Sequence, residues 1–222
     1  AASKDARRTL AKRLAKMLVD IPLFDGIDLD WETPSSEAQW RDMGKLAKDI
    51  RLAYVHATEG AGGKREMLLT FTYHPGTGSV QAIRGIKGKK SQKGFLDFFD
   101  FGHAMAYSQF DRERRHSTHQ HDVATIDEWT NNGLPAGKLT LGMPFFGVNR
   151  KSGETKTYFE ILEKEKSLYE RPDVDDSSDG VYFVNRKSAA QKVALAKQRG
   201  VGGIMIWELG QDAKTPRQSM LA

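Results

Sequence analysis

Cysteine is absent from the 222-residue sequence. This excludes disulfide bonds and thiolate chemistry, although it is compatible with any cellular compartment. No stretch approaches the ~18 consecutive apolar residues that a membrane-spanning helix needs. The formal net charge is +5, but the basic residues are scattered and no RNA- or DNA-binding signature accompanies them. We therefore expect neither a membrane nor a nucleic-acid partner.

The composition is that of one globular domain. Hydrophobic residues make up 39% of the chain and charged residues 28%, enough for a core and a well-solvated surface. The sequence begins Ala-Ala-Ser, without a methionine and without a signal-peptide pattern. We expect that processing or truncation has removed what came before.

Strand-like and helix-like segments alternate along the chain. The strand-like segments are apolar on both faces, which is typical of a parallel sheet built from βαβ units. We predict strands at residues 22–32, 66–73, 98–107, 139–145 and 203–207, and helices at residues 4–19, 37–57, 122–131, 158–166 and 188–199.

The most informative segment is residues 24–32, in which three acids stand at two-residue spacing. Asp28, Asp30 and Glu32 alternate with apolar neighbours. A strand sends alternate side chains to opposite faces, so the three carboxyls share one face. Like charges so placed repel one another and resist desolvation. Catalytic chemistry explains the pattern better than stability does.

Two other interpretations of this segment are weaker. A surface strand of an antiparallel sheet also alternates, but Gly26 stands where a backbone needs room and Pro34 ends the strand. Calcium-binding loops also space acids by two residues. However, they need small, flexible residues between the ligands rather than isoleucine, leucine and tryptophan.

Residues 24–32 resemble the Asp-Gly-x-Asp-x-Asp-x-Glu signature of glycoside hydrolase family 18, which comprises chitinases and related endo-N-acetylglucosaminidases. All four acidic positions are filled, by Asp25, Asp28, Asp30 and Glu32. Three further segments are similar to family motifs and occur in the family's order. They are residues 105–108 (Met-Ala-Tyr-Ser, strand six), residues 138–147 (strand seven) and residues 202–212 (strand eight, with Trp207).

The resemblance implies a (β/α)8 barrel of the α/β class, of which this chain covers about strands four to eight. Residues 1–222 would be the C-terminal part of a single catalytic barrel, because a complete barrel needs about 250 residues. Five strands alone would leave two open edges. We expect a missing N-terminal segment or a partner chain to complete the barrel.

The resemblance also implies site residues and a mechanism. Barrel enzymes carry catalytic groups at the C-terminal ends of strands, so Glu32 is expected to be the general acid. Three acids on one strand do not face each other across a sugar ring. The nucleophile is then the 2-acetamido oxygen of the substrate, in the substrate-assisted retaining mechanism known for this family. Asp30, with Asp28 behind it, would orient the acetamido N–H.

Four further residues are expected to bind substrate. Tyr107 would donate a hydrogen bond to the acetamido oxygen, and Trp207 would form an apolar floor beneath the sugar, although plain core packing is an equally good interpretation of a tryptophan taken alone. Met105 and Asp25 complete the set by their positions in the family motifs.

The sequence departs from the family pattern at three positions. Ser108 stands where an aspartate is expected, Phe146 where a tyrosine is usual, and Val148 where an arginine is common. Residues 146–202 are too few for the large α+β insertion of some family members, which predicts a shallow, open cleft and endo-type cleavage. Four histidines in or near a polar loop lack a metal-ligand spacing, so we expect no metal and no cofactor: His103, His116, His119 and His121.

The function that follows is endo-type hydrolysis of β-1,4-linked N-acetylglucosamine polymers, with chitin or N-acetylglucosamine oligosaccharides as the partner. Two alternatives remain open. One is a non-catalytic, chitinase-like carbohydrate-binding or structural subunit, and the other is an endo-β-N-acetylglucosaminidase that acts on N-glycans. A secreted or extracellular location is expected from the resemblance.

Overall fold

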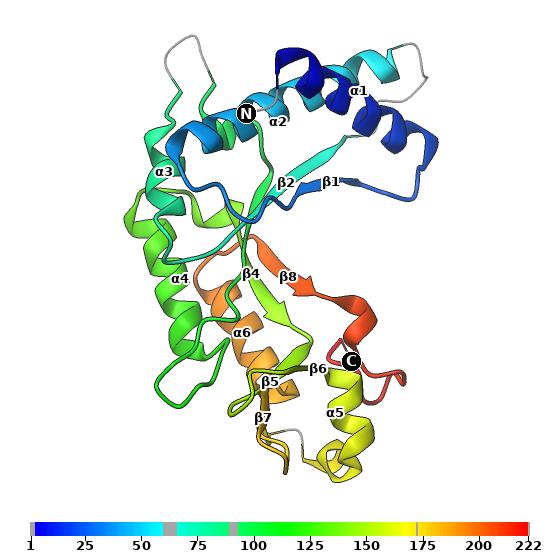
Figure 1. Ribbon diagram of the computed structural model, residues 1–222, viewed down its shortest axis with the longest axis vertical. Coiled ribbons are helices and arrows are strands. Elements are labelled where there is room, and N and C mark those ends of the chain that lie inside the picture. The colour runs from blue at the N-terminus through cyan, green and yellow to red at the C-terminus, as the bar shows by residue number, and fades with distance from the viewer. Residues whose placement is uncertain (1–2, 60–65, 89–92, 172, 222) are drawn as a thin grey trace. The chain divides into compact units, whose positions relative to one another are not determined.

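The protein is described by a computed structural model that covers residues 3–59, 66–88, 93–171 and 173–221 (Figure 1). The chain divides into two compact units. The N-terminal unit is Ala1–Gly102 with Asn132–Leu134, and the C-terminal unit is His103–Asn131 with Pro135–Ala222. Within the described ranges, none of the helices is both long enough and apolar enough to cross a membrane.

The N-terminal unit alternates helices with parallel strands. Both predicted helices are confirmed to within one residue, whereas the first strand is shorter than the predicted residues 22–32. The elements are α1 (Lys4–Asp20), β1 (Gly26–Leu29), α2 (Glu37–Thr58), β2 (Leu68–Tyr73), α3 (Ser79–Gly85), the 3-10 helix η1 (Phe95–Asp97) and the first half of β3 (Phe101–Ala104).

Serine side chains begin both long helices of this unit. The Ser3 hydroxyl accepts a hydrogen bond from the Ala6 N–H, and the Ser36 hydroxyl accepts one from Gln39. Such caps satisfy backbone donors that a helix start otherwise leaves unpaired. The chain is thereby directed into α2 soon after the acidic segment.

An aromatic cluster packs α2 against β2. The Trp40 ring of α2 meets Phe71 of β2 and Phe95 of η1 edge-on, with ring centroids 6.0 and 5.7 Å apart. All three side chains are buried. Edge-to-face pairs are favourable for aromatic quadrupoles, so this cluster fixes β2 beneath the helix.

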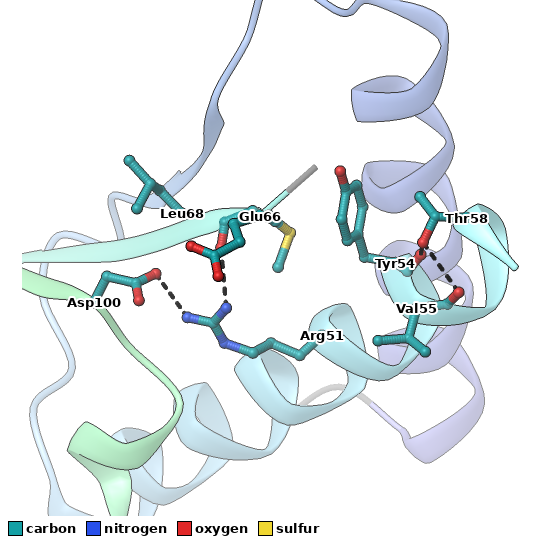
Figure 2. A pocket seen from close by; sticks show the side chains of 8 residues that line it. Arg51, Tyr54, Val55, Thr58, Glu66, Leu68 and Asp100 are labelled. Carbon is teal, nitrogen blue, oxygen red and sulfur yellow. Dashed lines mark hydrogen bonds and ion pairs between the residues drawn. The ribbon is translucent and has the colours of Figure 1, made fainter. Parts of the chain in front are cut away.

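Arg51 of α2 ties the helix to the starts of β2 and β3 (Figure 2). Its guanidinium donates to the Phe98 carbonyl at 2.7 Å, the Met67 carbonyl at 3.0 Å and the Asp100 carboxylate at 2.7 Å. The same carboxylate accepts the Leu69 N–H at 2.7 Å. Arg51, Met67 and Asp100 line a cavity of about 370 Å³ at the beginning of β2, whereas the acidic segment lies at the end of β1.

The close pairing of β1 with β2 depends on a glycine. A Cβ atom at Gly26 would lie 1.9 Å from the Leu68 carbonyl oxygen, which no side chain tolerates. The sequence-based prediction that the backbone needs room at Gly26 is confirmed. From this point the strands run in parallel, with Asp28 opposite Thr70.

The C-terminal unit continues the alternation of helices and parallel strands. The predicted strands at 139–145 and 203–207 and the predicted helices are confirmed, with small shifts at their ends. The elements are the second half of β3, α4 (His119–Asn131), η2 (Ala136–Lys138), β4 (Leu139–Pro144), β5 (Phe146–Asn149), β6 (Thr155–Thr157), α5 (Tyr158–Lys164), η3 (Lys166–Glu170), β7 (Val181–Phe183), α6 (Arg186–Gln198), β8 (Gly203–Trp207) and η4 (Leu209–Gln211).

Hydrogen bonding gives the parallel strand order β1-β2-β3-β4-β8, and the chain passes from one unit to the other within β3. In the C-terminal unit β4 and β8 pair in parallel, with Pro144 opposite Trp207. The predicted parallel α/β architecture is therefore confirmed.

The segment between β4 and β8 corrects one prediction. The sequence predicted helices there and no large α+β insertion. The structure contains a second, antiparallel sheet in the order β6-β5-β7, with α5 following β6. Strands of three or four residues are too short for alternation to reveal them. A smaller α+β insertion is thus present, and the inference of a shallow, open cleft loses its basis.

A buried lysine joins three elements of the C-terminal unit. Lys192 of α6 donates to Asp122 of α4 at 2.7 Å, to the Ser117 hydroxyl at 2.8 Å and to the Gly142 carbonyl of β4 at 2.7 Å. The Lys192 and Asp122 side chains are 2% and 3% exposed. Burial lowers the pKa of Lys192 and raises the pKa of Asp122, so each charge depends on the other.

We predict that Lys192→Met lowers the free energy of unfolding by about 3–5 kcal/mol, because it leaves the Asp122 carboxylate buried without its partner. Urea unfolding of the purified protein measures the change. Lys16→Met is the control, since the Lys16–Asp20 pair on α1 is 74% and 51% exposed and exposed pairs contribute about 0–1 kcal/mol. A loss no greater for Lys192→Met than for this control would contradict the prediction.

Candidate active site

Two of the three acids predicted to be catalytic each face a threonine of the neighbouring strand. The Thr70 hydroxyl donates to the Asp28 carboxylate at 2.6 Å, directly across the strand pair. Two residues further along, the Thr72 hydroxyl donates to Asp30 at 2.5 Å. Each aspartate therefore has one carboxylate oxygen held by a neutral hydroxyl donor.

The third acid faces a histidine instead. Glu32 lies beyond the end of β1, and His74 follows β2. The His74 Nε2 atom is 3.5 Å from the Glu32 carboxylate, and the two side chains are 31% and 55% exposed. We call the three contacts, Asp28–Thr70, Asp30–Thr72 and Glu32–His74, the acid–donor ladder.

The remaining acid of the signature lies just before the strand. The backbone carbonyl of Asp25 accepts the Leu68 N–H at 3.0 Å, which extends the β1–β2 pairing by one bond. Asp25 is exposed, as are its neighbour Phe24 and, past the strand, Trp31. The N-terminal unit thus holds all four acids of the signature along one short segment.

The C-terminal unit brings Met105 and Tyr107 into one buried cluster with Phe146 and Val148, against which Met205 packs. The Tyr107 ring meets Phe146 edge-on with centroids 5.8 Å apart, and its hydroxyl lies 3.9 Å from the Met205 sulfur. The two predicted substrate-binding residues from strand six therefore share one environment.

Gly142 of β4 provides the space in which the tyrosine lies. A Cβ at Gly142 would stand 2.7 Å from the Tyr107 ring and 2.5 Å from the Ala104 carbonyl oxygen. Because the Gly142 carbonyl also accepts a hydrogen bond from Lys192, the buried lysine acts directly on the backbone that supports Tyr107.

Trp207 ends β8 and is 46% exposed. Its carbonyl accepts the Phe145 N–H at 2.8 Å, which fixes the backbone while the ring remains accessible. Plain core packing, the alternative interpretation of this tryptophan, does not describe a half-exposed ring. An accessible indole face is suited to stacking on a sugar.

The residue that departs most from the family pattern has an unusual backbone. Ser108 has a φ of 62°, in the left-handed region that non-glycine residues seldom adopt. Its N–H donates to His116 Nδ1 at 3.4 Å. The His116 ring also stacks on Phe146 at 5.3 Å, so His116 contacts two of the three departures at once.

The four histidines predicted to lie in or near a polar loop have different surroundings in the structure. His116 is fully buried, and His103 of β3 pairs with the Thr140 hydroxyl of β4 at 2.5 Å. His119 and His121 belong to the first turn of α4. Burial, with a further contribution from the charge of Lys192, lowers the pKa of His116 to about 4. Among the described residues no group of three or more potential ligands could hold a metal ion.

The donors of the ladder, Thr70, Thr72 and His74, were not predicted from the sequence. Residues 66–73 were predicted only as a continuous apolar strand, and β2 is indeed buried along most of its length. The signal was the spacing of Thr70, Thr72 and His74, which repeats the two-residue spacing of the acids. In a parallel pair with this register, equal spacing places a donor opposite each acid.

A parallel α/β fold with carboxyl groups at the end of a strand is the arrangement of many barrel enzymes. The model of the family described as glycosyl hydrolases family 18 matches residues 1–212 of this chain. The chain belongs to glycosyl hydrolase family 18, which confirms the resemblance found in its sequence.

Curated relatives are named chitinases. The chain is 27% identical to chitotriosidase-1 of Mus musculus over 85% of its length and 50% of that protein. It is 25% identical to endochitinase 1 of Metarhizium robertsii over 97% of its length and 58% of that protein. The chain therefore spans about half the length of the curated relatives it matches.

Solved structures show the same fold. A GH18 chitinase of Flavobacterium johnsoniae superimposes with a TM-score of 0.71 at 24% identity, over 98% of this chain and 64% of the other. A chitinase-like agglutinin of Robinia pseudoacacia gives a TM-score of 0.74 at 19% identity, over 97% and 72%. Together with the parallel strand order, these likenesses confirm a partial (β/α)8 barrel.

The buried His116 predicts a loss of stability in acid. Because its folded pKa is about 4 and an unfolded histidine has a pKa near 6.5, only the unfolded state takes up the proton between these values. The free energy of unfolding should fall by roughly 3 kcal/mol as the pH drops through this window. Urea unfolding at several pH values measures it. His116→Phe should flatten this dependence, whereas His56→Phe, which changes an exposed residue of α2, should leave it unchanged; equal slopes for both variants would contradict the assignment.

Proposed function

We propose that the protein is a chitinase, a hydrolase that cleaves β-1,4-linked N-acetylglucosamine polymers, and that it acts by a substrate-assisted retaining mechanism. The acid–donor ladder is the observation that carries this proposal. It holds Asp28 and Asp30 by hydroxyl donors and leaves Glu32 half-exposed at the end of the strand. Reaction with a bulky polymer requires such an accessible acid.

In the first step Glu32 donates its proton to the glycosidic oxygen as the C1–O bond breaks. The three acids come from one strand and its end, so they are not arranged as two carboxyls facing each other across a sugar. The oxygen of the substrate's own 2-acetamido group attacks C1 and forms a cyclic oxazolinium ion. In the second step the Glu32 carboxylate takes a proton from water. The oxygen of that water attacks C1, which opens the oxazolinium ring and restores the β configuration.

Asp30 would accept a hydrogen bond from the acetamido N–H and stabilise the positive charge of the intermediate. Thr72 supports this role because it holds one oxygen of Asp30 at a fixed position. Asp28, two residues before Asp30 on the same face of the segment, contributes negative charge to that face.

Residues of the C-terminal unit and Asp25 would bind the substrate. Tyr107 would donate its hydroxyl to the acetamido oxygen and thereby aim it at C1, with Met105 packed in the same cluster. The half-exposed ring of Trp207 would stack beneath the distorted sugar. Asp25 would bind the sugar through its exposed carboxylate.

A non-catalytic, carbohydrate-binding function is the second candidate. It is favoured by Ser108, which places a hydroxyl where the family resemblance leads one to expect a carboxylate. One protein of the same fold is described as a chitinase-like agglutinin. A third candidate is an endo-β-N-acetylglucosaminidase that acts on N-glycans, which differs in substrate but not in the chemistry proposed for Glu32.

We also propose that residues 1–222 form the C-terminal part of a single catalytic barrel, completed by further chain or by a partner. Apolar side chains shortly before β1 and after β8 are exposed, Leu23 at 87% and Leu209 at 65% among them. Further elements of the barrel would cover this apolar surface. Because a chitin polymer cannot cross a cell membrane, a secreted or extracellular location accords with this function.

We predict that Glu32→Gln lowers kcat on chitotetraose by about 10²–10⁴-fold, because glutamine keeps the shape of the side chain but has no proton to give. Calorimetric titration should show oligosaccharide binding retained within a few-fold. Glu37→Gln is the matched control: this glutamate begins α2 and is 50% exposed, and its substitution should leave turnover unchanged.

The same experiment separates the candidates. Turnover by Glu32→Gln within tenfold of the parent protein would show that Glu32 is not the acid. Binding of chitotetraose by a parent protein that shows no turnover would favour the carbohydrate-binding function. Release of glycan from a glycoprotein, without cleavage of chitotetraose, would favour the third candidate.

A further inference from the structure

The donor side of the ladder is built from two kinds of side chain. Thr70, Thr72 and His74 stand at two-residue spacing along β2 and its end, each against one acid of the facing segment. A threonine offers one hydroxyl, whereas an imidazole has two distinct ring nitrogens, one of which can donate a hydrogen bond. Glu32 is the one acid of the ladder that faces an imidazole.

This difference matches what each acid does in the proposed reaction. In the proposed reaction Asp28 and Asp30 neither give nor receive the proton that is transferred, so a hydroxyl donor serves them at every stage. Glu32 alternates between a protonated acid and a carboxylate. A group that donates to the carboxylate form stabilises the charge that appears on Glu32 when its proton leaves.

We propose that His74 is a positioning residue for Glu32, which orients its carboxyl group and stabilises the carboxylate formed by proton donation. This inference rests on the proposed function. As the proton of Glu32 moves to the glycosidic oxygen and the C1–O bond breaks, the Nε2–H of His74 donates to the oxygen left negative. In the second step water returns a proton to Glu32, and His74 keeps its own proton throughout.

The backbone around His74 is suited to this role. The Thr77 hydroxyl donates to the His74 carbonyl at 2.7 Å and contacts the Ser79 hydroxyl, 2.8 Å away, at the start of α3. The turn after β2 is thereby fixed while the imidazole stays partly exposed. The 3.5 Å separation from Glu32 exceeds an ordinary hydrogen bond, and catalytic hydrogen bonds commonly tighten only when substrate binds.

The test compares two substrates that need the proton to different extents. Cleavage of chitotetraose expels a sugar alkoxide, which requires protonation, whereas a nitrophenyl chitobioside expels a stable phenolate. His74→Leu should lower kcat on chitotetraose about tenfold, a fold-change typical of one lost hydrogen bond to a charged group. Its KM should stay within about twofold, and its kcat on the nitrophenyl substrate should fall much less.

Four variants control the experiment. His74→Gln retains an N–H donor and should recover most of the lost kcat, and His74→Ala replaces His74→Leu if the latter fails to fold. Adding His74→Leu to Glu32→Gln should cause no further loss, because both act on one proton transfer. His56→Leu removes an exposed His–Glu contact of 3.3 Å on α2 and should change neither substrate's kinetics.

The outcomes for the two proposals are distinct. If Glu32→Gln remains active, the proposed function fails. If Glu32→Gln is inactive but His74→Leu leaves kcat unchanged, or lowers it equally on both substrates, the proposed function stands and the role of His74 is overturned. Failure of His74→Gln to recover kcat would likewise overturn it.

Discussion

The parallel pairing of β1 with β2 is the constraint on which the acidic segment depends. Gly26 allows the two backbones to approach, and the register that follows places Asp28 directly opposite Thr70. Every later contact of the ladder is set by that register, since a shift of one residue would turn the acids to the other face. The burial of β2 beneath α2 holds the donor side in place. A row of carboxyls that would be unfavourable on an isolated strand is thus matched by a row of donors.

The C-terminal unit relies on a different interaction, the buried Lys192–Asp122 pair. A fully buried lysine is costly unless its donors are satisfied, and here they are satisfied by a carboxylate, a hydroxyl and the Gly142 carbonyl. Because Tyr107 lies against Gly142, the same hydrogen bonds that stabilise the unit fix the surroundings of a predicted substrate-binding residue. Stability and the proposed binding function therefore share one set of contacts.

The sequence predicted what long periodic patterns encode. The helices over residues 4–19 and 37–57 and the parallel strands followed from apolar periodicity, and the family followed from the resemblance of the acidic segment to a known signature. The short strands β5, β6 and β7 were missed because three or four residues show no clear period. The burial of His116 was missed because it results from packing against Phe146 and Tyr182 far along the chain, and a polar-looking loop gives no sign of this. Thr70, Thr72 and His74 were visible in their spacing, but their meaning depends on a register that only the folded strand pair supplies.

The central claim is that Glu32 works with a nucleophile that the substrate itself supplies. The ladder places the three acids on one segment, so a second carboxyl facing Glu32 across the sugar is not part of this account. The most direct test compares chitotetraose with cellotetraose, which lacks the acetamido group and should not be cleaved, and records proton NMR of the products immediately after mixing. New reducing ends should appear as the β anomer, because two displacements at C1 restore the original configuration. Initial formation of the α anomer would require direct attack by water and would contradict the account.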